Sequence, residues 1–101
     1  GVFTPTEMMR ALELGAAALK LFPAEAQSPV ALKAMRVVLP SSAKVFPVGG
    51  VTPESMAPWR AAGASGFGLG SALYKPGMTS EQVRERAGIF IAEWTRISAG
   101  S

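Results

Sequence analysis

Residues 15–25 read Gly-Ala-Ala-Ala-Leu-Lys-Leu-Phe-Pro-Ala-Glu, an apolar run that contains one lysine and is followed by Pro-Ala-Glu. Seven of the eight residues from Gly15 to Phe22 are apolar or glycine, and the exception is Lys20. A short apolar run bounded by turn residues is typical of a strand buried on both faces of a parallel sheet. Periodicity alone leaves a helix open, but Gly15 before the run and Pro23 after it favour a strand that ends at the proline.

Lys20 is the residue of this strand with reactive chemistry. Burial of an unpaired ammonium group costs free energy, and a desolvated lysine lowers that cost by holding more of its neutral amine. The neutral amine is the form that attacks a carbonyl to make a Schiff base. The alternative is that Lys20 lies near the strand end and extends its ammonium into water, and the run by itself favours this alternative.

Composition limits the chemistry that the chain can perform. It has 101 residues with neither Cys nor His, and all seven acidic residues are Glu. This excludes Cys/His zinc sites, His-based triads and Asp-rich magnesium cages, so we expect no metal and no cofactor. The net charge is +3, but the basic residues are scattered and form no stripe with interleaved aromatics. We therefore expect no nucleic-acid partner.

The expected location follows from what the sequence lacks. No apolar run approaches membrane-spanning length, and the N-terminus has no signal-peptide pattern. Without cysteine there is no disulfide framework, so we expect a cytoplasmic protein with no membrane partner.

Hydrophobic residues make up 49% of the chain, which is high for a free-standing domain of this size. The chain opens at Gly1-Val2-Phe3, as at the end of a strand, and is expected to be part of a larger α/β body.

Helix-start signals recur along the chain at a nearly constant interval. They are Thr4-Pro5, Ser28-Pro29 and Thr52-Pro53, which are equally spaced, and Thr79, which follows after a slightly longer interval. The first three combine an N-cap side chain with proline at the first helical position. The second helix is expected to end at Pro40, with Val38 and Leu39 on its buried face.

Strands are expected between these helices, at 1–3, in the run around Lys20, at 45–48 and at 66–70. A strand and a helix in this length form the βα unit of a parallel sheet, and serial units curl into a (β/α) barrel. About four units, the first strand only partly present, amount to half of an eight-stranded TIM barrel. We therefore expect residues 1–101 to form a single partial barrel domain of the α/β class. Its sheet edges would be open, so it is either a fragment or a half that pairs with another copy.

Two glycine-containing loops follow the last two expected strands. Gly49-Gly50 and Gly70-Ser71 would lie at the carboxyl ends of strands, where such barrels bind ligands. Glycine lets backbone N–H groups approach an anion, and helix N-termini add positive partial charge. Either loop alone is a common turn, but the two together with a lysine on an earlier strand predict a phosphate site. Phe22 either stacks on the ligand or fills the barrel mouth, and Glu25 is expected to support the loop rather than transfer protons.

Four motifs occur in order: Gly-Val-x-Thr-Pro-Thr-Glu at 1–7, Leu-Lys-Leu-Phe-Pro-Ala-Glu at 19–25, Pro-Val-Gly-Gly-Val at 47–51 and Gly-Leu-Gly-Ser at 68–71. In order and spacing they resemble the C-terminal half of the 2-keto-3-deoxy-6-phospho-sugar-acid aldolases, the KDPG/KDPGal family. The resemblance covers nearly the whole chain. It implies a class I aldolase on a (β/α)8 barrel, a homotrimer that needs no metal, with the N-terminal half of the barrel outside this chain.

The same resemblance assigns roles to individual residues. Lys20 would condense with the C2 ketone of the substrate, and cleavage of the C3–C4 bond would leave an enamine of pyruvate. Phe22 would pack beside the bound keto acid. The phosphate or carboxylate end would be held by N–H and hydroxyl donors of Gly49, Gly50, Gly70 and Ser71. The expected partners are therefore small molecules, a phosphorylated keto sugar acid and pyruvate.

The residue at position 48 is expected to affect which substrate the protein prefers. Gluconate-type members commonly carry Pro-Thr-Gly-Gly where this chain has Pro-Val-Gly-Gly at 47–50, and the valine is more similar to the phosphogalactonate members. Valine removes a hydroxyl that would bond a substrate oxygen, which should shift the preference between C4 epimers. The resemblance thus implies cleavage of 2-keto-3-deoxy-6-phosphogalactonate to pyruvate and glyceraldehyde 3-phosphate, with the gluconate epimer as the alternative.

Part of the family's site has no counterpart in this sequence. The catalytic glutamate and an arginine lie on early strands in the family, and neither Glu7 nor Glu25 matches that position. Loss of general acid–base help typically removes a factor of ~10²–10⁴, so we expect the chain alone to be inactive or nearly so. Two other interpretations stay open: a non-catalytic phosphate-binding half-barrel in which Lys20 is only an electrostatic contact, and a barrel enzyme similar to the thiamin-phosphate synthases.

Overall fold

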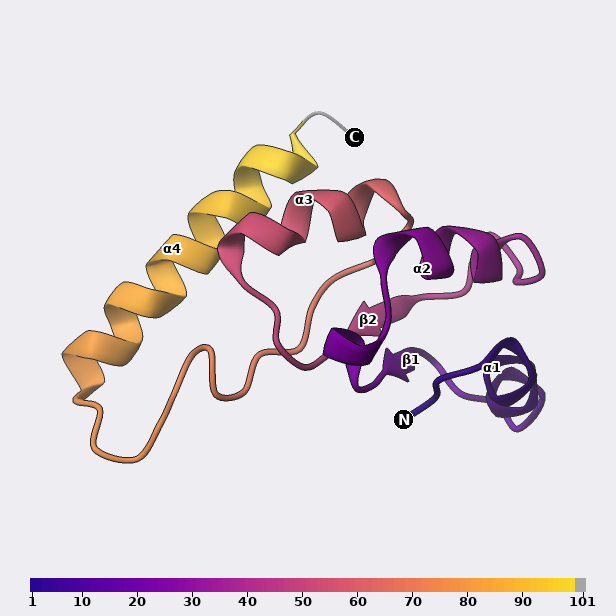
Figure 1. Ribbon diagram of the computed structural model, residues 1–101, viewed down its shortest axis with the longest axis horizontal. Helices are drawn as coiled ribbons and strands as arrows, with labels where there is room; N and C mark the ends of the chain where they lie inside the picture. The colour runs from indigo at the N-terminus through magenta and orange to yellow at the C-terminus, as the bar shows by residue number, and fades with distance from the viewer. Residues whose placement is uncertain (100–101) are drawn as a thin grey trace.

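Capped helices alternate with strands in the computed structural model of the chain, which describes residues 1–99 (Figure 1). Four helices begin directly after Thr4, Ser28, Thr52 and Thr79. They are α1 (Pro5–Glu13), α2 (Pro29–Arg36), α3 (Pro53–Ala61) and α4 (Ser80–Ser98). In each case the N-cap hydroxyl accepts a hydrogen bond from a backbone N–H of the first turn. The predicted helix starts are confirmed.

The sheet is built around two parallel strands, β1 (Leu19–Leu21) and β2 (Val45–Pro47). In their register Lys20 lies opposite Phe46. Single parallel bridges join Val2 to β1 and join Val48 to Gly68. Four segments therefore lie side by side in chain order, the arrangement expected of consecutive βα units. The predicted α/β class is confirmed.

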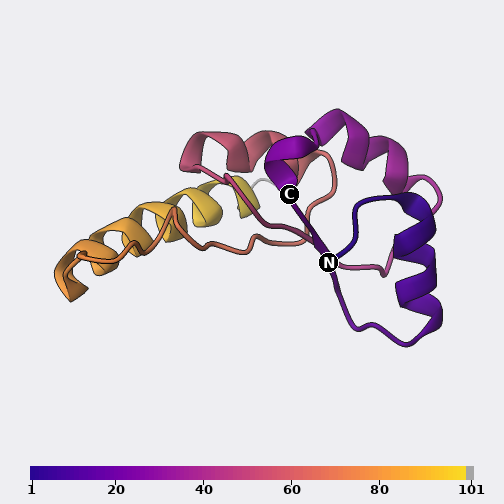
Figure 2. The same ribbon diagram turned by 60° about the horizontal axis from the view of Figure 1, so that its bottom comes forward.

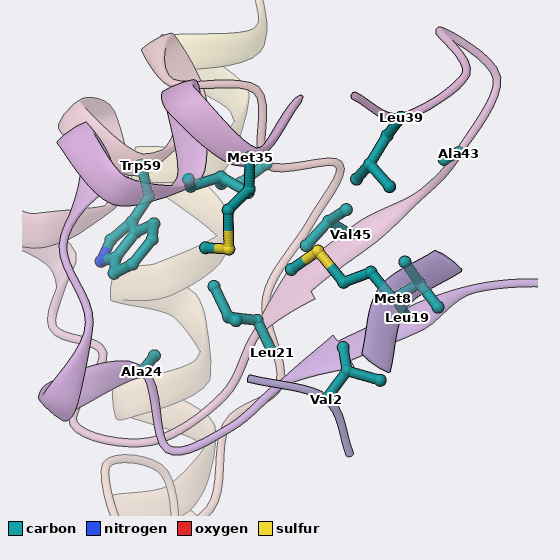
Figure 3. Packing of buried hydrophobic residues seen from close by; sticks show 12 residues of the cluster. Val2, Met8, Leu19, Leu21, Ala24, Met35, Leu39, Ala43, Val45 and Trp59 are labelled. Atoms are coloured by element: carbon teal, nitrogen blue, oxygen red, sulfur yellow. The ribbon is translucent and has the colours of Figure 1, made fainter. Parts of the chain in front are cut away.

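The core lies between the sheet and helices α1, α2 and α3 (Figure 3). Its centre is formed by side chains that are fully buried or nearly so, from the strands and from each of these helices: Met8, Leu19, Leu21, Leu32, Met35, Val45 and Trp59. A smaller cluster of Val51, Met56 and Phe90 lies where α3 packs against α4. Figures 1 and 2 show α1 and α4 at opposite ends of the molecule. No helix within residues 1–99 combines the length and hydropathy that a membrane span requires.

One face of β1 is exposed, and the prediction of a strand buried on both faces is wrong in this respect. Leu19 and Leu21 are buried, but Lys20 between them is exposed. Successive side chains of a strand point to opposite faces of its sheet. The helices cover the face of the two leucines, and the opposite face leaves the ammonium group accessible to water.

Two element boundaries also differ from the predictions. The stretch 66–70 contributes only the bridge at Gly68, because its alternating glycines supply little side chain to pack and weaken a strand. Helix α2 ends at Arg36, and the chain continues in a tighter turn in which the N–H of Val38 bonds to the carbonyl of Met35. This turn is wound more tightly than an α-helix, so Val38 rotates away from the core and is exposed, whereas Leu39 is buried.

Candidate active site

Lys20 and Phe22 lie on the same face of β1 because they are next-but-one neighbours in an extended segment. The Nζ atom of Lys20 is 4.6 Å from the centroid of the Phe22 ring. The Phe22 side chain itself is 48% exposed. An ammonium group over an aromatic face at an exposed site gains about 0.5–1 kcal/mol. The structure therefore brings the predicted nucleophile into contact with the predicted aromatic residue.

A cavity of about 260 Å³ adjoins Phe22. It lies where neighbouring segments of the sheet reach their carboxyl ends. All six of the predicted substrate-binding residues line it: Phe22, Val48, Gly49, Gly50, Gly70 and Ser71. Lys20 does not line the cavity and reaches its edge through the ring of Phe22. The predicted site residues thus form one continuous surface, with the lysine at its margin.

The turn at Gly49-Gly50 has a backbone that requires glycine. The φ angles are +113° at Gly49 and +68° at Gly50, a region that residues with a Cβ rarely adopt. The turn packs against the short 3₁₀ helix Ala24–Ala26, whose first N–H donates to the carbonyl of Val48 at 2.9 Å. The loop after β1 and the loop after β2 are therefore held together at the cavity wall.

The N-terminus of α3 follows this turn, but its own capping uses most of its donors. Pro53 has no N–H, and the N–H of Ser55 donates to the hydroxyl of Thr52. The Thr52 N–H donates in turn to the hydroxyl of Ser55. The sequence predicted that helix N-termini add to an anion site. Here the capping box uses the N–H groups of Thr52 and Ser55, which leaves the N–H of Glu54 and those of the glycine turn outside it.

Val48 and the loop at Gly70-Ser71 form the remaining wall. The Val48 side chain lies over Gly68, where an added Cβ would come within 2.5 Å of the valine Cγ2. The loop at Gly70-Ser71 continues to Ala72, whose carbonyl accepts a hydrogen bond of 3.1 Å from Nε of Arg86 in α4. Val48 therefore contributes methyl groups to the wall, and Ser71 provides a hydroxyl.

The sequence did not identify every residue of the cavity. Val51, Gly68, Leu69 and Ala72 also line it, and three of them are direct sequence neighbours of the predicted loop residues. Glu25 also lines the cavity, and among the lining residues that the structure describes it is the one with a charged side chain. Within residues 1–99 no group of three or more His, Cys, Asp or Glu side chains is placed to hold a metal ion.

Comparison with known proteins finds one matching family and several relatives. Residues 1–88 match the aldolase family described as KDPG and KHG aldolase. The chain is 50% identical over 91 residues to the 2-dehydro-3-deoxy-6-phosphogalactonate aldolase of Escherichia coli, covering 90% of this chain and 44% of that protein. It is 45% identical over 100 residues to a probable 2-dehydro-3-deoxy-6-phosphogalactonate aldolase of Rhizobium meliloti, covering 99% of this chain and 47% of that protein.

A solved structure described as native KDPGal superposes on the chain with a TM-score of 0.95 at 46% identity. The match covers 98% of this chain and 48% of that one. The chain thus spans about half the length of the relatives it matches. Since the family match extends over most of the sequence, the chain belongs to the KDPG and KHG aldolase family.

Proposed function

We propose that the chain is the C-terminal half of a (β/α)8 barrel aldolase that cleaves 2-keto-3-deoxy-6-phosphogalactonate to pyruvate and glyceraldehyde 3-phosphate. The observation that carries the proposal is the continuous surface from Lys20 through Phe22 to the glycine-lined cavity, found in a member of an aldolase family. The chain-order pairing of four parallel segments supports the half-barrel. The relatives named as phosphogalactonate aldolases support the substrate.

In the proposed reaction Lys20 is the nucleophile. Its amine adds to the C2 ketone and water leaves, which forms an iminium ion. The iminium withdraws electrons, so the C3–C4 bond breaks as the C4 hydroxyl loses its proton and glyceraldehyde 3-phosphate departs. The bond electrons remain as an enamine, which takes a proton at C3. Addition of water to the resulting imine releases pyruvate and restores the amine.

The cavity residues would hold the substrate around this lysine. Phe22 would pack beside the keto acid, and its ring contact with Lys20 would orient the side chain that carries the amine. N–H groups of Gly49, Gly50 and Gly70 and the hydroxyl of Ser71 would bind the phosphate end. Val48 would face the sugar carbons and disfavour the epimer that needs a hydrogen-bond donor at this position.

The proposal extends to the rest of the protein. General acid–base catalysis would come from the N-terminal half of the barrel, so the 101 residues alone are expected to be inactive or nearly so. The complete enzyme would be a homotrimer that needs no metal, as the family resemblance implies, and a cytoplasmic protein without a cofactor, as the composition indicates.

The direct test is release of pyruvate from 2-keto-3-deoxy-6-phosphogalactonate, followed with a coupled dehydrogenase. Two proteins are compared: the 101-residue chain, and the joined protein, in which this chain replaces the C-terminal half of the Escherichia coli relative. We expect turnover by the joined protein and little or none by the chain alone. Equal turnover by both would contradict the half-barrel assignment, and a folded joined protein without turnover would contradict the assigned substrate.

The exposure of Lys20 supports a second candidate function. An exposed ammonium group at the margin of the cavity is also suited to an electrostatic contact with a bound phosphate, without any covalent step. In that case the chain would be a phosphate-binding half-barrel without chemistry. Lys20→Arg separates the two candidates, because it keeps the charge needed for binding and removes the amine needed for a Schiff base.

A further inference from the structure

We propose that Glu25 is a positioning residue for the Gly49-Gly50 turn, and that it acts through the shape of its side chain. The inference rests on the proposed function, because the turn is assigned there to the phosphate end of the substrate. Glu25 is in the 3₁₀ helix that follows β1, whereas the turn that it contacts follows β2. It lines the same cavity as both glycines.

The contact is visible in the space that each glycine leaves open. A Cβ added to Gly49 would collide with Oε1 of Glu25. A Cβ added to Gly50 would lie 3.0 Å from the Glu25 Cβ and 3.2 Å from its Oε2. The Glu25 side chain therefore crosses the turn and occupies the space that Cβ atoms on Gly49 and Gly50 would otherwise fill. Neither partner tolerates a bulkier neighbour without moving.

Two consecutive glycines with positive φ angles need such a support. Glycine loses more conformational freedom on ordering than any other residue, so an unsupported pair samples several backbone arrangements. The bond from the Ala24 N–H to the Val48 carbonyl fixes the entry to the turn but not its tip. The Glu25 side chain covers the tip, which would keep the turn in the arrangement that forms the cavity wall. Such preorganisation raises affinity by reducing the ordering cost of binding.

The charge of Glu25 argues for a role through shape. A carboxylate beside a phosphate site repels the ligand, so it would not be the phosphate contact itself. Glu25→Gln keeps the length and branching of the side chain and removes the charge, whereas Glu25→Ala removes the atoms that cover Gly49. The two variants therefore separate shape from charge.

The first test measures steady-state kinetics and pyruvate trapping in the joined protein. For Glu25→Ala we expect KM for the phosphorylated substrate to rise roughly tenfold, which is the effect of losing one hydrogen bond from the glycine turn to the charged phosphate. Borohydride trapping of pyruvate on Lys20 should persist, since pyruvate has no phosphate. Glu25→Gln should recover most of the loss, and Glu13→Ala, at an exposed position at the end of α1, is the matched control.

Several outcomes would overturn the inference. An unchanged KM in Glu25→Ala would show that the turn needs no support from this residue. A defect in Glu25→Gln as large as in Glu25→Ala would show that charge and not shape is needed. Equal loss of trapping and of phosphate affinity would show a general folding defect. If the unsubstituted joined protein itself traps no pyruvate, the proposed function fails. The inference about Glu25 is then decided by the unfolding measurements of the second test.

That second test is a double-mutant cycle in the joined protein, using the midpoint of denaturant unfolding. Gly49→Ala is strained by its positive φ in any background, and this cost cancels in the cycle. When Glu25 is present, the new alanine side chain at position 49 must also displace the Glu25 carboxylate. We expect the midpoint shift to be about twice as large with Glu25 present as in the Glu25→Ala background. Equal shifts would show that Glu25 does not pack on the turn in solution.

Discussion

Phe22 connects Lys20 to the cavity: its ring centroid is 4.6 Å from the lysine Nζ, and the same residue lines the cavity wall with Gly49 and Gly50. Alternation along β1 places both side chains on one face, while Leu19 and Leu21 enter the core. A single strand thus anchors the fold on one side and carries the exposed Lys20 side chain on the other.

This contact predicts the effect of Phe22→Leu. Leucine keeps apolar bulk at the cavity edge but has no ring face for the ammonium group. A cation–π contact of about 0.5–1 kcal/mol corresponds to roughly a two- to fivefold effect. We expect the rate of borohydride trapping of pyruvate in the joined protein to fall by that factor, with Phe22→Tyr close to the original rate. Equal rates in all three proteins would show that the ring does not orient the lysine.

Val48→Thr tests the origin of substrate preference. The substitution exchanges a methyl group at the cavity wall for a hydroxyl of similar size. We expect the ratio of kcat/KM values for the galactonate and gluconate epimers to shift toward gluconate by about tenfold. Both kcat/KM values are measured in the joined protein with the two pure substrates. A shift of the same size toward galactonate would contradict the assigned role of this position.

Gly68→Ala tests the close packing between Gly68 and the side chain of Val48. The new Cβ would approach Val48 Cγ2 at 2.5 Å, so we expect a loss of about 1–3 kcal/mol in the free energy of unfolding. Val48→Ala removes that methyl group, and the double variant should lose less than the sum of the two. Gly88→Ala in α4 is the control, because its Cβ meets nothing within 4 Å and a helix interior favours alanine. Denaturant unfolding measures all four, and additive losses would contradict the contact.

The capping box of α1 predicts a pH dependence. Hydrogen bonds lower the pKa of the Glu7 carboxyl, chiefly the one from the Phe3 N–H and next the one from the Thr4 hydroxyl. A carboxyl with a lowered pKa stabilises the fold above the ordinary value of 4.5, and this contribution is lost as the pH falls through the folded pKa. Glu7→Gln should therefore lower the thermal midpoint at pH 7.

The same two proteins are compared again at pH 3, where the gap between their midpoints should narrow. Glu13→Gln is the control, since its carboxylate pairs with the exposed side chain of Arg10. A gap that widened on acidification would have the wrong sign for a group that is stabilised in its charged form.

Local signals in the sequence were sufficient for the helices. Thr4, Ser28, Thr52 and Thr79 each cap the helix predicted for them, because capping depends on residues within one turn. The motif spacing likewise predicted which loops meet at the cavity, since parallel strands in series bring their carboxyl ends to one edge.

Features that depend on contacts between distant segments could not be predicted in this way. The apolar run around Lys20 indicated a strand but not which face would be covered, and the lysine is exposed. Glu25 was interpreted as a loop support without a partner, because Gly49 lies beyond the next helix and strand of the chain. The stretch 66–70 has the apolar pattern of a strand, but its glycines leave pairing only at Gly68.

The most direct measurement is borohydride reduction in the presence of pyruvate, followed by intact and peptide mass spectrometry. It is performed on the joined protein, on its Lys20→Arg variant and on the 101-residue chain. The proposed function predicts a stable adduct on the peptide that contains Lys20, absent from the arginine variant. Failure to trap pyruvate in a joined protein that is folded would contradict the Schiff-base role of Lys20 and leave the phosphate-binding half-barrel.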